Sequence, residues 1–354
     1  MTGTITKRKR PPVLTAVDLF SGCGGLTQGL KDAGFSVLAA VELDSLAAST
    51  YRTNHRDVSL FSRDIRTVTS PELLKICGLK TGELDLLAGC PPCQGFSRLR
   101  DNNRRSRMAD PRNRLIDEVL RLIEALRPKV AMLENVPNLA KYTRYIAFKR
   151  RLQQLGYDIS DTVLDVADFG VPQRRKRLVV LASRVGTMTQ LQPVSTRKTV
   201  RDAIAGLPHT ERSDDPLHNL GEARSERIRR LIGSIPKNGG SRSDLPKHLT
   251  LRCHANTDGY YDVYGRMAWD DVAPTITGGC INPSKGRFLH PEEDRAITLR
   301  EAALLQSFPL DYAFSLERGK YAAAEMIGNA LPPAFSRIQA EAIKSHLKSV
   351  DSRR

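Results

Sequence analysis

The stretch best suited to covalent chemistry is Gly89-Cys90-Pro91-Pro92-Cys93-Gln94, which follows a short apolar run at 84–88. Two prolines fix the backbone just before Cys93, so its thiol is held rigidly at the end of a predicted strand. A thiolate held in this way is a nucleophile suited to attack on a ring. Cys90 and Cys93 could instead form a redox pair or half a zinc site, but no second Cys-x-x-Cys follows and the histidines are dispersed. We therefore expect Cys93 to be catalytic and the chain to hold no metal.

A second group of residues could bind a nucleoside. The glycine turn Ser21-Gly22-Cys23-Gly24-Gly25 follows an apolar run that ends in Asp18-Leu19-Phe20. Glycines let a backbone turn sharply and approach a ligand, although the G-x-G-x-x-G fingerprint is not met. Glu42 ends the next apolar run, where an acid can accept both ribose hydroxyls, and Asp64 with Ile65 suits an exocyclic amine and a purine face. Each acid alone could be a capping residue, but together they favour an adenosine-containing cofactor.

Two further candidates for catalytic groups are an acid and a basic cluster. Glu134 closes an apolar run and leads into Asn135-Val136-Pro137, a turn that Asn and Pro would fix. Its carboxyl lies near Cys93 if the two strands are neighbours, and the alternative is a solvated acid at a strand end. The cluster Gln173-Arg174-Arg175-Lys176-Arg177 precedes another apolar run. It is either a solvated face or a source of guanidiniums aimed into the cleft.

These residues need a scaffold, and the chain from about 13 to 180 alternates short apolar runs with amphipathic segments. The apolar runs predict strands at 15–20, 36–42, 84–89, 130–134 and 178–183. Helical spacing appears between them at 26–33, 46–54, 114–126 and 146–155. Such alternation predicts an α/β fold with a doubly wound, mostly parallel sheet. The ligand then belongs at the carboxyl ends of the strands, where every motif above falls.

Changes in composition and periodicity divide the chain into parts. Residues 1–12 form a basic arm, and 13–184 with 320–354 are expected to make the catalytic domain. The remainder, 185–319, is predicted to be a smaller, irregular domain, because a segment this long is not a mere loop in a compact fold. Its part from about 185 to 265 is rich in Arg, Ser, Pro, Asp and Gly.

The charge balance points to the partner. Lys and Arg number 55 against 39 for Asp and Glu, which gives a net charge of +16 among 354 residues. An excess of this size favours a polyanion such as nucleic acid, with a basic tail and solvated faces as the alternative. The apolar run 13–20 contains Asp18 and is too short for a signal peptide or a membrane span. We expect a cytoplasmic protein with reduced thiols and without a membrane partner.

In this order, the motifs resemble those of DNA (cytosine-5) methyltransferases. The resemblance covers about 13–345, apart from the variable segment near 185–260. The residues that carry it are Asp18–Gly25, Pro91-Pro92-Cys93-Gln94, Glu134-Asn135-Val136, Gln173-x-Arg175-x-Arg177, Arg266–Gly279, Leu299–Pro309 and Gly328–Pro333. It implies a Rossmann-like domain that binds S-adenosylmethionine, a smaller target-recognition domain, and double-stranded DNA from which a cytosine is flipped out.

The resemblance also implies roles for single residues. Cys93 would attack carbon 6 of cytosine, Glu134 would hold the ring at N3 and the amino group, and Arg175 and Arg177 would lie near the base and the thiolate. The implied cofactor residues are Asp18, Phe20, Gly22, Gly24, Glu42, Asp64, Ile65 and Asn329. The loop from Ser97 to Arg114 is expected to close over DNA. Expected DNA contacts are Ser97, Arg98, Arg112, Arg242 and Arg252, with Arg197, Lys198 and Arg201 as further candidates.

Three other functions fit parts of the sequence. Methylation of transfer RNA uses the same chemistry, but the context of Cys93 and the sizeable variable segment favour DNA. A non-catalytic DNA-binding regulator should lack the nucleophile or the acid, yet Cys93 and Glu134 are present. A nicotinamide-dependent oxidoreductase has a different glycine spacing. For a monomeric DNA methylase, the role could be solitary or paired with a cognate restriction endonuclease.

Overall fold

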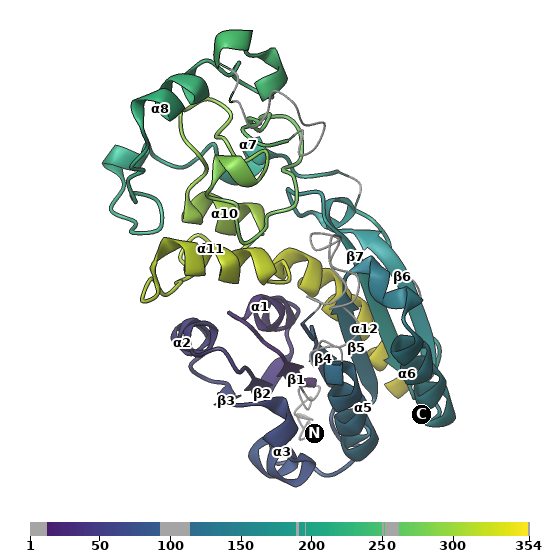
Figure 1. The fold of residues 1–354 in the computed structure, drawn as a ribbon. Coiled ribbons are helices and arrows are strands. Elements are labelled where there is room, and N and C mark those ends of the chain that lie inside the picture. The colour runs from purple at the N-terminus through teal and green to yellow at the C-terminus, as the bar shows by residue number, and fades with distance from the viewer. Residues whose placement is uncertain are drawn as a thin grey trace, which may run out of the picture.

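The computed structural model describes residues 13–92, 114–188, 191–194, 196–249, 251 and 262–352. Within them, a seven-stranded sheet has the order β3-β2-β1-β4-β5-β7-β6 (Figure 1). The strands are β1 (Thr15–Leu19), β2 (Ser36–Val41), β3 (Ser59–Phe61), β4 (Leu86–Gly89), β5 (Val130–Asn135), β6 (Asp158–Asp165) and β7 (Lys176–Ser183). Cys93, Ser97, Arg98, Arg112 and Arg252 lie outside the described residues, so the predictions made for them stay predictions.

The sheet is mostly parallel, as expected for the α/β class. Strands β1 to β5 pair in parallel, whereas β7 runs antiparallel to both β5 and β6. Two strands were missing from the prediction. Strand β3 spans only three residues, and β6 lies at the edge with no residue fully buried, so neither carries a strong apolar signal.

Helices cover both faces of this sheet. The helices of the sheet layer are α1 (Gly25–Asp32), α2 (Ser45–Asn54), α3 (Ser70–Cys77), α5 (Leu115–Leu126), α6 (Thr143–Gln154) and α12 (Pro333–Asp351). Buried residues of α5 recur at helical spacing, at Leu115, Val119, Leu122 and Leu126 among others. Helices α3, α5 and α6 pack on one face, and α1 and α12 on the other. None of the described helices is long and apolar enough to cross a membrane.

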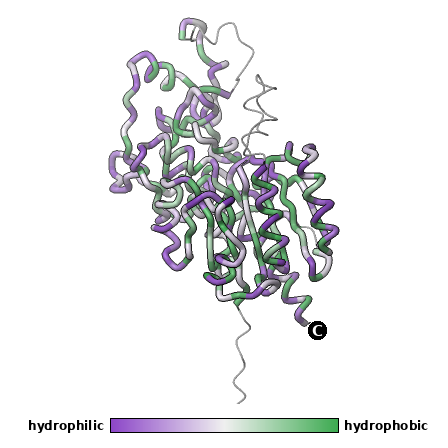
Figure 2. Tube along the Cα trace, turned by 60° about the horizontal axis from the view of Figure 1, so that its bottom comes forward, coloured by the Kyte–Doolittle hydropathy of each residue, from purple (hydrophilic) through white to green (hydrophobic). Residues whose placement is uncertain are grey.

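Alternate residues of each strand supply the two cores. In β5, Ala131 and Leu133 face the core under α5 and α6, whereas Val130 and Met132 face α1 and α12. A fully buried Leu or Ile side chain contributes about 1.5–3 kcal/mol. Hydrophobic residues therefore run along the strands, and hydrophilic ones gather on outer helices and loops (Figure 2).

A smaller lobe sits beyond the carboxyl ends of the strands, with α11 between it and the sheet (Figure 1). Its helices are α7 (Val200–Ile204), α8 (Glu226–Gly233), α10 (Leu299–Leu305) and α11 (Gly319–Asn329). Its main core also includes Cys23 and Leu46 from the sheet layer. Buried residues of α11 join this core, while α12, which follows it, packs on α1. The proposed domain boundaries near 184 and 320 stay predictions.

A distal part of this lobe is built around Arg266, whose side chain is fully buried. Its Nη1 donates to the carbonyl oxygens of His290 and Glu293, and its Nη2 donates to that of Ile232 and to the carboxylate of Asp294. One guanidinium thus satisfies backbone carbonyls at the end of α8 and in the segment near 290. Buried polar groups without such partners are costly, so Arg266 fixes how these segments meet.

Replacing Arg266 by leucine should lower the free energy of unfolding by about 3 kcal/mol, because the substitution leaves several buried carbonyls unpaired. Urea denaturation followed by circular dichroism measures the change. The matched control is Arg229→Leu, since Arg229 is exposed on α8 and pairs only with Glu226 across the surface. That control should cost no more than about 1 kcal/mol. Equal losses in the two variants would contradict the role given to Arg266.

Candidate active site

The strand order brings the reactive candidates to one edge of the sheet. Strand β4 lies between β1 and β5, and Gly89 is the register partner of both Leu19 and Leu133. The chain therefore leaves β4 toward Cys93 beside the residue that precedes Glu134. Strand β5, which carries Glu134, therefore neighbours β4, the strand before Cys93, as the prediction for Glu134 required. The position of Cys93 itself lies outside the described residues.

Glu134 forms a buried ion pair. Its Oε1 lies 2.7 Å from Nε of Arg177, and the two side chains are 8% and 14% exposed. The contact lacks hydrogen-bond alignment, so Oε1 has no hydrogen-bond partner within the described chain. Arg177 is the second residue of β7, the neighbour of β5, and Leu178 after it pairs with Asn135. The structure thus brings two of the predicted catalytic residues together.

Cys90 also lies beside Glu134, but its thiol holds its proton. Burial, and then the neighbouring carboxylate of Glu134, raises the pKa of the Cys90 thiol well above its usual range. Only the thiolate is a good nucleophile, so Cys90 is unsuited to covalent attack. Among the described residues no cluster of His, Cys, Asp and Glu could hold a metal ion.

Asn135 is a positioning residue that the sequence analysis treated only as part of a turn. Its Nδ2 donates to the carbonyl oxygen of Pro91 at 2.9 Å, and its Oδ1 accepts from the backbone N–H of Val136. Asn135 therefore ties the segment entering Cys93 to the strand end that carries Glu134. Its place directly after Glu134 at a strand end was the available signal.

The glycine turn presents an open face beside Glu42. Gly22 has φ +55°, and a Cβ added there would meet nothing within 4 Å, so the backbone is accessible on that side. Its N–H donates to Oε2 of Glu42 at 2.8 Å, and Oε1 accepts from the N–H of Asp44. Burial raises the pKa of Glu42. Phe20 also has a left-handed backbone, φ 59°, which is strained for a residue with a side chain and is typical of ligand-binding turns.

The returning chain lies against the other side of this turn. A Cβ at Gly25 would be 2.2 Å from the carbonyl oxygen of Leu331, and one at Gly24 would be 2.4 Å from the ring of His55. Only glycine permits this approach. Asn329, exposed at the end of α11, lies two residues before Leu331. The structure thus brings the segment of Asn329 to the glycine turn.

Three predicted cofactor residues have structural partners of their own. Asp18 is fully buried, and its Oδ2 accepts from the hydroxyl of Thr27 at 2.7 Å. Asp64 caps a short turn by accepting from Arg66, and Ile65 is buried in the core. Their contact with a cofactor stays a prediction.

The predicted basic residues divide into two groups. Arg175 is buried, and its Nη1 donates to the carbonyl oxygens of Ile276 and Gly328. Exposed ion pairs hold Arg197 to Asp168 and Arg201 to Asp270.

Arg242 begins a short turn, Arg242–Asp244, in the smaller lobe. Lys198 is exposed, and the roles predicted for it and for Arg242 in DNA binding stay predictions.

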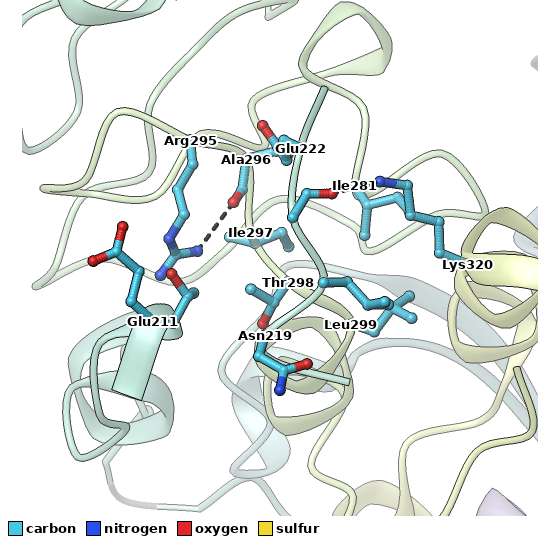
Figure 3. A pocket seen from close by; sticks show the side chains of 13 residues that line it. Glu211, Asn219, Glu222, Ile281, Arg295, Ala296, Ile297, Thr298, Leu299 and Lys320 are labelled. Atoms are coloured by element: carbon cyan, nitrogen blue, oxygen red, sulfur yellow. Dashed lines mark hydrogen bonds between the residues drawn. The ribbon is translucent and has the colours of Figure 1, made fainter. Parts of the chain in front are cut away.

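A cavity of about 260 Å³ opens elsewhere, in the smaller lobe. It is lined by Glu211, Asn219, Arg295, Thr298 and Lys320, among others (Figure 3). None of the predicted catalytic or cofactor residues lines it. Arg295 is already held by Glu293, Glu301 and the carbonyl oxygen of Ala296. This cavity is therefore separate from the candidate active site.

Comparisons with known proteins agree over nearly the whole chain. A family model for C-5 cytosine-specific DNA methylases matches residues 14–345. The type II methylase M.HgiDII of Herpetosiphon aurantiacus is 38% identical over 95% of this chain and 97% of its own. The type II methyltransferase M1.HphI of Haemophilus parahaemolyticus is 35% identical over 93% and 86%. The solved structure of Entamoeba histolytica methyltransferase EhMeth shares the fold, with a TM-score of 0.66 at 15% identity over 95% of this chain and 99% of that one.

The buried carboxyl of Asp18 predicts a pH-dependent stability. Burial raises the pKa of Asp18 to about 7, whereas the unfolded chain has an ordinary pKa of about 4. The folded state holds the proton more tightly, so this stabilisation is complete below about pH 4 and is lost as the pH rises to about 7. Asp18→Asn stays neutral, so its melting temperature relative to that of the wild type should rise between pH 5 and pH 8. A difference that does not change with pH in differential scanning fluorimetry would contradict this.

Proposed function

The chain belongs to the C-5 cytosine-specific DNA methylase family, and we propose that it transfers a methyl group from S-adenosylmethionine to carbon 5 of a cytosine in a short duplex DNA site. The observation that carries this proposal is the buried pair of Glu134 and Arg177 beside the segment that enters Cys93. This reaction needs an acid, a cation and a thiol together at one edge of the sheet.

Carbon 5 of cytosine is a poor nucleophile, so the ring must first be activated. The thiolate of Cys93 attacks carbon 6 and forms a covalent bond, which makes carbon 5 an enamine carbon. Glu134 binds the ring at N3 and the amino group and places a proton at N3 during attack. Arg177 holds the Glu134 carboxyl in place, and a nearby cation also favours the thiolate. Once carbon 5 carries the methyl group, a base removes its proton, the bond between carbon 6 and Cys93 breaks, and N3 returns its proton to Glu134, which restores the aromatic ring.

The residues around the glycine turn fit an adenosine-containing cofactor. The open face of Gly22 leaves room for a ligand, and each oxygen of Glu42 accepts one backbone N–H, which leaves lone pairs for ribose hydroxyls. S-adenosylmethionine, when bound there, supplies an electrophilic methyl group. Phe20, Gly24 and Asn329 would complete the site. Asp18 would support the glycine turn through its hydrogen bond with the hydroxyl of Thr27.

The DNA has to deliver its cytosine to this edge. A base inside a duplex cannot reach a buried carboxyl, so the target must be flipped out. We assign DNA contacts to the loop that begins at Ser97, including Arg98 and Arg112, and to Arg242 and Arg252. Because M.HgiDII and M1.HphI are named type II enzymes, a cognate restriction endonuclease is the proposed partner.

Expression of the chain should methylate cytosines at one short motif in plasmid DNA, and Cys93→Ala should abolish this. Bisulfite sequencing of the plasmid measures both, and Cys77→Ala, at a half-buried cysteine of α3, is the matched control that should methylate normally. Persistent methylation by Cys93→Ala would remove Cys93 as the nucleophile. Unmethylated DNA with folded wild-type protein that binds S-adenosylmethionine would favour the RNA substrate.

Glu134→Gln should lower kcat about 10²- to 10⁴-fold, the range that general acid–base catalysis contributes. The amide keeps the shape of the side chain but cannot deliver the proton and leaves Arg177 without its charge partner. Single-turnover methylation of a duplex oligonucleotide measures the rate, and calorimetry should show nearly unchanged affinity for S-adenosylhomocysteine. A comparable rate for variant and wild type would exclude Glu134 from proton placement.

A further inference from the structure

A buried hydrogen-bonded cluster joins the two lobes next to the cofactor residues. Gln173 and Gln306 are fully buried, and they come from the turn before β7 and from the end of α10. Nε2 of Gln173 donates to Oε1 of Gln306 and, at 3.3 Å, to the carbonyl oxygen of Leu305. Oε1 of Gln173 accepts from the N–H of Ile276 at 2.9 Å. Each glutamine therefore bonds to segments that are distant in the sequence.

The cluster ends on the last turn of α11. Nε2 of Gln306 donates to the carbonyl oxygen of Ile327 at 2.7 Å, and Nη1 of Arg175 donates to that of Gly328 at 2.9 Å. The last carbonyls of a helix have no partner within the helix, so these side chains supply what the helix lacks. The guanidinium also lies at the negative end of the helix dipole, where a cation is favourable.

The end of α11 has no room to shift toward its neighbour. A Cβ at Gly328 would be 2.3 Å from the carbonyl carbon of Thr277, so the two backbones are in direct contact. Arg175 also bonds to the carbonyl oxygen of Ile276, which holds that neighbouring segment in place. Asn329, the next residue along, is exposed, so its place is set by the backbone that this cluster holds.

We propose that Gln306 is a positioning residue for the cofactor, and that it acts through Asn329. Together with Gln173 and Arg175 it fixes the carboxyl end of α11, and so it sets where Asn329 meets the ligand beside the glycine turn. This inference rests on the proposed function, in which Asn329 belongs to the S-adenosylmethionine site. Gln306 touches neither cofactor nor substrate in this scheme.

The test is a double-mutant cycle on S-adenosylhomocysteine binding, measured by isothermal titration calorimetry on the full chain. Gln306→Met keeps the length of the side chain but removes its donors, and it should weaken binding about tenfold. Asn329→Ala should weaken binding at least as much. If Gln306 acts through Asn329, the double variant should bind no more weakly than Asn329→Ala alone. If Gln306→Met does not fold, Gln306→Asn is the second variant. Its shorter side chain keeps the amide but cannot reach the same partners, so it should weaken binding in the same way.

A matched control separates positioning from general stability. Gln339 is also fully buried, but its Nε2 donates only to Phe335 within α12, so Gln339→Met should bind like the wild type. In turnover, Gln306→Met should raise KM for S-adenosylmethionine more than it lowers kcat, and its affinity for duplex DNA should be unchanged.

The outcomes distinguish a failure of the proposed cofactor from a failure of the positioning role of Gln306. A wild type that does not bind S-adenosylhomocysteine would overturn the proposed cofactor itself. A wild type that binds, with Gln306→Met binding equally well or with fully additive losses in the double variant, would overturn the positioning role while leaving the proposed function intact.

Discussion

The candidate site depends on the parallel pairing of β4 with β1 on one side and with β5 on the other. Gly89 is in register with both Leu19 and Leu133, so three segments leave the sheet at one level. That level carries the glycine turn, the segment that enters Cys93, and Glu134. A slip of one residue would turn Glu134 to the opposite face of the sheet. Because both faces are packed by helices, such a slip would also exchange the residues that fill the two cores.

The ion pair of Glu134 and Arg177 is costly for the fold. Two charges lose most of their water there, and an apolar pair of similar volume often holds strands together as well. Stability alone therefore does not explain the pair, whereas the chemistry does. A carboxylate that is fixed by one cation is preorganised for a bound ring, and little reorganisation is needed when the base arrives.

The sequence predicted the strands that are buried on both faces, because continuous apolar runs are a strong signal. The edge strand β6 lacked this signal. Strand-end residues such as Glu134 and Glu42 could also be found, since their place relative to a run is visible. The basic cluster shows the limit. Gln173, Arg175 and Arg177 turn inward while Arg174 and Lys176 are exposed. For Arg175 that choice depends on backbone carbonyls 101 and 153 residues away along the sequence. Gln306 was missed for the same reason, because carbonyl partners leave no trace in residue identity.

The two lobes share a buried apolar core. Cys23 and Leu46 of the sheet layer belong to the main core of the smaller lobe, and α11 continues directly from that core into the segment that lies on α1. An interface with a shared apolar core resists the free domain motion that polar interfaces allow. The smaller lobe and Glu134 then keep a nearly fixed separation. Under the proposed function, the movement that brings cytosine to the acid must come from the DNA, so the target base has to leave the duplex.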